Sequence, residues 1–133
     1  MPATIMIVDE DRAFVDRLAL MLAQAGYMVV GSVGRDEALD NLETHKGAID
    51  LAIIDLNVPG ISGPELIGAI QRRMPATRII ATVPGEGPDL TDVAARTGAD
   101  RVMRRPGKGQ PIDRELWIGV IEGLLGRAGR GAA

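Results

Sequence analysis

Acidic residues stand at the ends of two apolar runs. TIMIV is followed directly by Asp9, Glu10 and Asp11, and LAII is followed by Asp55. A buried carboxylate costs free energy unless a cation or a hydrogen-bond donor compensates it. Two carboxylates about 4 Å apart repel by roughly 4 kcal/mol at an effective dielectric constant near 20. If the folded chain gathers these residues, we expect a cation to bind between them.

The ligand types indicate which cation and which chemistry. Carboxylate oxygens without a nearby His or Cys favour Mg²⁺, with Mn²⁺ as an alternative. Thr82 ends a further apolar run and Arg105 follows the next one. A metal ion, a hydroxyl and a cationic side chain are what a transferring phosphoryl group requires, because its negative charge spreads over several oxygens. The set predicts phosphoryl chemistry with Asp55 as the acceptor.

Short apolar runs alternate with segments of helical periodicity. The runs predict five strands, over residues 4–8, 27–33, 49–54, 77–82 and 100–103. The helical segments are 14–25 before Gly26, 64–74 behind a cap at Ser62 or Gly63, 90–97 before Gly98, 117–124, and a weaker one over 35–46. Strict alternation predicts an α/β fold with a doubly wound, five-stranded parallel sheet.

The sheet would bring the candidate residues together. Ligands of open α/β sheets bind beyond the carboxyl ends of the strands, where the winding direction reverses. In the strand order 2-1-3-4-5 the first and third strands are neighbours, so Asp9 and Asp55 would lie on either side of that point. Thr82 and Arg105 would reach the same edge.

Composition sets outer limits on the function. The 133 residues fit one domain, expected over 1–126, with a flexible tail over 127–133. A net charge of −3 gives no basic footprint for direct nucleic-acid binding. We find no apolar stretch long enough to cross a membrane and no secretory signal, which predicts a cytoplasmic location. The absence of cysteine excludes disulfides and thiolate metal sites.

Four motifs, in this order and at these separations, resemble the receiver domain of two-component response regulators, the CheY-like fold. They are IMIVDED, IIDLNVPGISGPEL, IIATV and VMRRP, and the resemblance extends over residues 4–126. Its most specific part runs from Asp55 to Leu66 and includes Asn57, Pro59, Gly63 and Glu65.

The resemblance implies a role for each candidate residue. Asp55 would take a phosphoryl group from a histidine kinase or phosphotransfer protein, and Asp9, Glu10, Asp55 and the backbone carbonyl of Asn57 would hold Mg²⁺. Thr82 would bind the phosphoryl oxygens. The chain would be a signalling module rather than an enzyme, acting on a downstream protein or on an effector domain outside this sequence. Its last strand and helix are the expected face for a homodimer.

The sequence departs from the receiver pattern near the site. Arg105 precedes Pro106 where receivers carry a lysine, and Val102 and Val83 stand where receivers favour an aromatic and a small residue. Arginine is planar and bulkier than lysine, so this exchange is not conservative. Lys108 is a candidate substitute for the missing lysine.

Each signal also has a simpler interpretation. The acids at 9–11 are suited to the start of a helix, and Asp55 to a turn in which its side chain binds nearby backbone. Two other functions follow from these alternatives. One is a degenerate pseudo-receiver that binds proteins without phosphorylation. The other, from Asp9-x-Asp11, is a haloacid-dehalogenase-type phosphatase, which would turn over p-nitrophenyl phosphate repeatedly.

Overall fold

Five parallel strands form one sheet in the order β2-β1-β3-β4-β5, which confirms the predicted fold class and strand order. The computed structural model describes residues 2–57, 60, 62–86, 92 and 95–126. The strands are β1 (Thr4–Val8), β2 (Met28–Ser32), β3 (Leu51–Asp55), β4 (Arg78–Val83) and β5 (Arg101–Arg104). The predicted helix residues Leu90, Val93 and Ala94, and the tail 127–133, lie outside the described residues.

Strand limits differ from the predicted ones by one or two residues, except for β1. The largest shift is at β3, which begins at Leu51 rather than at residue 49. Asp50 precedes the strand because it closes a polar contact with β1. Its backbone N–H donates to the Thr4 carbonyl at 2.9 Å, and its carboxylate accepts from the Thr4 N–H at 2.8 Å. Asp50, which falls inside the strand predicted over 49–54, therefore fixes the starts of β1 and β3 relative to each other.

The helices begin at polar caps. They are α1 (Arg12–Gln24), α2 (Arg35–Thr44), α3 (Gly63–Arg73) and α5 (Arg114–Leu124). Asp11 caps α1 by accepting from the Phe14 N–H at 3.1 Å, and Ser62 caps α3 by accepting from the Glu65 N–H at 3.2 Å. Side-chain caps satisfy N–H groups that the first helical turn leaves without partners. Ser62, not Gly63, is thus the cap of α3.

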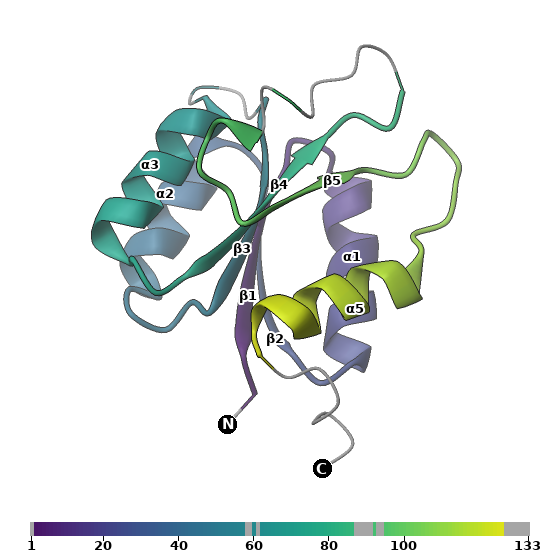
Figure 1. Ribbon diagram of the computed structural model, residues 1–133, viewed down its shortest axis with the longest axis horizontal. Helices are drawn as coiled ribbons and strands as arrows, with labels where there is room; N and C mark the ends of the chain where they lie inside the picture. The colour runs from purple at the N-terminus through teal and green to yellow at the C-terminus, as the bar shows by residue number, and fades with distance from the viewer. Residues whose placement is uncertain (1, 58–59, 61, 87–91, 93–94, 127–133) are drawn as a thin grey trace.

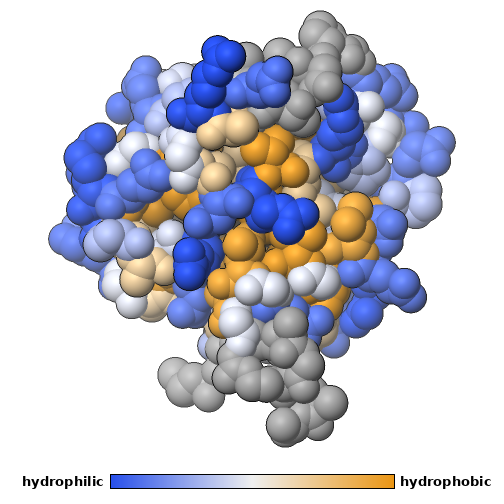
Figure 2. Space-filling model, in the orientation of Figure 1, coloured by the Kyte–Doolittle hydropathy of each residue, from blue (hydrophilic) through white to orange (hydrophobic). Residues whose placement is uncertain are grey.

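Helices cover both faces of the sheet, α1 and α5 on one side and α2 and α3 on the other (Figure 1). Side chains alternate between the faces along each strand. Ile5, Ile7, Leu51, Ile53 and Ile80 pack toward α1 and α5. The intervening residues, such as Met6, Val8, Ala52 and Ile54, pack toward α2 and α3. Figure 2 shows apolar side chains over β5 and α5 on the face turned to the viewer.

None of the helices in the described ranges combines the length and apolar character that crossing a bilayer requires.

Gly63 allows the first turn of α3 to lie directly against the chain that follows β3. A Cβ at this position would overlap the Leu56 backbone and lie 2.9 Å from the Asp55 carbonyl oxygen. The Gly63 N–H also donates to the Leu56 carbonyl at 3.0 Å. This close approach sets the path of the chain immediately after Asp55.

Gly63→Ala is expected to lower the free energy of unfolding by about 2 kcal/mol or more, because the added methyl group meets backbone that has no room to move. Gly119→Ala is the matched control, since Gly119 lies on the exposed side of α5 with nothing near its Cβ position. That change should stabilise the protein by up to about 1 kcal/mol. Urea denaturation of the three proteins measures both values, and equal stability of the two variants would contradict the account.

Candidate functional site

Strand register places the candidate residues side by side. Val8 pairs with Ile54, so Asp9 and Asp55 follow on neighbouring strands. Asp55 in turn pairs with Thr82. All three residues continue the alternation that faces α1 and α5, and Arg105, two positions beyond Met103, does so as well. The structure thereby brings together Asp9, Asp55, Thr82 and Arg105.

The two aspartates are buried, and each is held by the backbone two residues farther along the chain. Asp9 and Asp55 are each 1% exposed. Asp9 Oδ1 accepts from the Asp11 N–H at 2.9 Å, and Asp55 Oδ1 accepts from the Asn57 N–H at 3.1 Å. The simpler turn interpretation of Asp55 therefore describes real contacts. These contacts fix one oxygen of each carboxylate and leave the other oxygen to point elsewhere.

Arg105 lies between the two carboxylates. Its Nη1 donates to Asp9 Oδ1 at 2.9 Å and lies 3.7 Å from Asp55 Oδ2, and the side chain is 19% exposed. A guanidinium so placed offsets the like-charge repulsion of the aspartates. The acidic residues predict a cation at this point, and part of that positive charge comes from the chain itself.

Three buried polar atoms of the site have no hydrogen-bond partner within the described part of the chain. They are Asp9 Oδ2, Asp55 Oδ2 and Thr82 Oγ1. Leaving a buried polar group unpaired costs about 1–3 kcal/mol. Two hard oxygen ligands suit Mg²⁺ or Mn²⁺, and a hydroxyl beside them suits a phosphoryl oxygen. The donor set fits the predicted ion.

The other predicted ligands are arranged differently. Glu10 is exposed, and Asp11 is used as the cap of α1. Across the described ranges no group of three or more Asp, Glu, His or Cys side chains is placed to hold a metal ion. The structure therefore gathers two of the predicted carboxylates, not three. The metal-binding roles of Glu10 and of the Asn57 carbonyl stay predictions.

Burial changes the acidity of Asp9. Loss of hydration is the largest cause and raises the pKa of Asp9 to about 6. The hydrogen bond from the Asp11 N–H opposes this shift, the charge of Asp55 adds to it, and Arg105 lowers the pKa again. The ionised carboxylate is thus held at a cost in free energy, which a cation close by would reduce.

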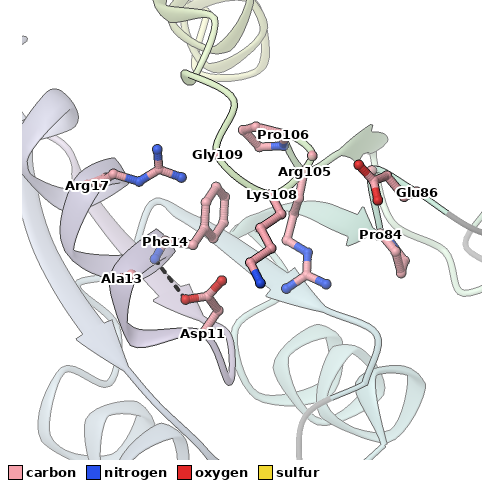
Figure 3. Close-up of a pocket in the computed structure, with 12 residues that line it drawn as sticks. Asp11, Ala13, Phe14, Arg17, Pro84, Glu86, Arg105, Pro106, Lys108 and Gly109 are labelled. Carbon is pink, nitrogen blue, oxygen red and sulfur yellow. Dashed lines mark hydrogen bonds between the residues drawn. The ribbon is translucent and has the colours of Figure 1, made fainter.

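A cavity of about 560 Å³ opens beside the site, between the start of α1 and the loops that follow β4 and β5 (Figure 3). Phe14, Arg17, Glu86, Arg105 and Lys108 are among the residues that line it. Figure 3 shows the Lys108 side chain extending toward the Arg105 guanidinium and Asp11. Arg17 and Glu86 belong to no sequence motif that predicts a site. Only the fold brings them to the wall of this cavity.

Comparison with known proteins assigns the family. A sequence model of the response regulator receiver domain matches residues 5–115. The chain belongs to the response regulator receiver family. The transcriptional regulatory protein GlrR of Escherichia coli K12 is 33% identical over 125 residues, which cover 93% of this chain and 26% of GlrR. The rice two-component response regulator ORR27 is 28% identical over 91% of this chain and 19% of its own length.

Solved receiver structures share the fold. A response regulator from Chloroflexus aurantiacus superposes with a TM-score of 0.79 at 23% identity, over 96% of this chain and all of that one. The BeF3-activated receiver domain of DrrB superposes with a TM-score of 0.76 at 22% identity, over 96% of this chain and all of its own. This receiver spans about a fifth to a quarter of the rice and E. coli regulators that it matches.

The raised pKa of Asp9 predicts a pH dependence of stability in metal-free buffer. Between its ordinary value of 3.8 and about 6, the folded state binds more protons at Asp9 than the unfolded state does. The free energy of unfolding contributed by this group therefore falls as pH rises through that window, by on the order of 2 to 3 kcal/mol.

Asp9→Asn removes this contribution and is the reference. Urea denaturation of both proteins in EDTA from pH 4 to pH 7 should show the native protein losing stability relative to the variant as pH rises. Parallel curves would contradict the assignment.

Proposed function

We propose that this receiver accepts a phosphoryl group on Asp55 and signals through the resulting change at the strand edge. The observation that carries the proposal is a pair of buried atoms on adjacent strands, Asp55 Oδ2 and Thr82 Oγ1, for which the described residues provide no hydrogen-bond partner. A carboxylate nucleophile beside an unpaired hydroxyl is suited to accept a phosphoryl group, because the hydroxyl donates a hydrogen bond to one of the phosphoryl oxygens.

The chemistry assigns one role to each residue. The Asp55 carboxylate attacks the phosphorus, the P–N bond of a phosphohistidine breaks, and an acyl phosphate forms while the electron pair leaves with the imidazole. Thr82 donates its hydroxyl proton in a hydrogen bond to a phosphoryl oxygen. When bound by Asp9, Asp55, Glu10 and the Asn57 carbonyl, Mg²⁺ neutralises charge on the phosphoryl oxygens. Hydrolysis of the acyl phosphate restores Asp55, so the chain acts only on its own phosphoryl group.

The proposed partners follow from this chemistry. The donor is a histidine kinase or a phosphotransfer protein, met in the cytoplasm. The proposed target of the signal is a downstream protein or an effector domain. The rice and E. coli relatives are long enough to carry such a domain outside the matched region. A phosphorylation-independent pseudo-receiver is the second candidate, and Arg105 favours it because its guanidinium already pairs with Asp9 and Asp55.

Incubation with acetyl phosphate and Mg²⁺, followed by intact mass measurement, separates these candidates. We expect a gain of one phosphoryl group in the native protein and in Asp36→Asn, a control acid exposed on α2. We expect no gain in Asp55→Asn, which lacks the nucleophile. No gain in any protein would favour the pseudo-receiver, and a gain that persists in Asp55→Asn would contradict the choice of acceptor.

We also propose that the face formed by β5 and α5 associates with a second copy of the chain. Apolar side chains gather over these elements (Figure 2), and Leu116 on α5 is 52% exposed. A contiguous exposed apolar patch is a common feature of association surfaces.

Leu116→Glu is expected to shift the receiver toward monomer at least about ten-fold in dissociation constant, since a charge would be buried at the contact. Light scattering over a concentration series measures the shift. Leu20→Glu is the matched control, because Leu20 is 61% exposed on α1, away from that face. Equal effects of the two changes would contradict the assigned surface.

A further inference from the structure

The side chain of Arg105 lies where a divalent ion would have to compensate the same charges. Its Nη1 is 2.9 Å from Asp9 Oδ1 and 3.7 Å from Asp55 Oδ2. We propose that Arg105 is a resident counter-cation of this site and that Mg²⁺ binds by displacing its guanidinium, in an exchange rather than an addition. The inference deepens the proposed function, since it takes Mg²⁺ as the ion of the site.

Mg²⁺ and the Arg105 guanidinium would compete for the same atom, Asp55 Oδ2. Asp55 Oδ2 has no hydrogen bond within the described residues, which makes it the oxygen of Asp55 available to a metal ion. The same atom is the one that Arg105 Nη1 approaches. A doubly charged ion on Asp55 Oδ2 would therefore lie close to a guanidinium that does not lose its proton at accessible pH. Repulsion between the two cations makes their binding mutually exclusive or strongly antagonistic.

The backbone of Arg105 is fixed, so only the side chain is able to give way. The Arg105 N–H donates to the Val83 carbonyl at 2.9 Å. A Cβ on Gly85 would overlap the Arg105 carbonyl, which shows how closely the loop after β4 packs on residue 105. These contacts hold the base of the side chain at the strand edge whichever cation is bound.

The cavity beside the site gives the displaced guanidinium a place to go. Arg105 lines this space of about 560 Å³ together with Glu86, whose carboxylate lies across from it in Figure 3. A guanidinium that turns away from Asp55 toward Glu86 keeps a carboxylate partner and gains hydration. The exchange therefore does not leave an unpaired buried cation, which would oppose it.

Calorimetric titration of the full chain with Mg²⁺ at pH 8 tests the exchange. Arg105→Met retains the aliphatic length of the side chain and removes its charge. We expect this variant to bind Mg²⁺ about ten-fold more tightly, or more, than the native receiver. Arg101→Met is the matched control, because it removes an equal charge from the exposed first residue of β5, at the opposite end of that strand from the site. Its affinity for Mg²⁺ should stay within about two-fold of the native value.

Thermal melting provides a readout that does not depend on phosphorylation. In EDTA, Arg105→Met should melt below the native receiver, since two buried carboxylates lose their counter-cation. Saturating Mg²⁺ should raise the melting temperature of the variant by more than it raises that of the native receiver. Equal or weaker Mg²⁺ affinity in Arg105→Met, or an equal gain in melting temperature for Arg105→Met and the native receiver, would overturn the proposal.

A measurement on the native receiver covers the case in which Arg105→Met does not fold. The side-chain Nε–H resonance of Arg105, assigned with Arg105→Lys, should shift on titration with Mg²⁺ as the guanidinium leaves the aspartates. An unmoved resonance at Mg²⁺ saturation would refute the exchange. Acetyl phosphate labelling is scored separately. If Arg105→Met binds Mg²⁺ more tightly but the native receiver gains no phosphoryl group, the exchange stands and the proposed function fails. The reverse result rejects only the exchange.

Discussion

Charge compensation between two buried carboxylates is the constraint on which this receiver depends. Asp9 and Asp55 are each 1% exposed and lie on neighbouring strands, where parallel pairing leaves them no room to separate. Each is tied at one oxygen by a backbone N–H two residues on, which fixes the orientation of the carboxylate. While both carboxylates are ionised, a cation offsets their repulsion, and the chain supplies one in Arg105.

The contacts that stabilise the site also prepare it for chemistry. The Asp11 and Asn57 N–H groups donate to one oxygen of each aspartate, and the second oxygen accepts no hydrogen bond from the residues that the structure describes. Thr82 adds a buried hydroxyl in the same condition one strand away. Unpaired polar atoms reduce the stability of the empty site, and a ligand that pairs with them recovers that loss on binding. Stability and reactivity are thus coupled through the same few atoms.

Arginine at residue 105 changes the balance between these two demands. A guanidinium presents several donors in a rigid plane and bridges two carboxylates well, which favours the metal-free fold. In the proposed exchange, the same bridge competes with Mg²⁺ for Asp55. The proposal thereby makes receiver and pseudo-receiver behaviour two outcomes of one electrostatic equilibrium, set by the Mg²⁺ concentration relative to the affinity of the site.

The sequence by itself determined the α/β fold, the strand order and the presence of Asp9, Asp55 and Thr82 at one edge. The fold class follows from hydrophobic periodicity, the strand order from the resemblance to receivers, and the shared edge from the rule that parallel strands end together. Only the tertiary structure decided that Arg105 bridges the aspartates, that Glu10 points to solvent while Asp11 caps α1, and that Arg17 and Glu86 share one cavity. Those facts depend on side-chain direction and on contacts between residues up to 96 positions apart, as between Asp9 and Arg105, and no pattern along the chain encodes such distances.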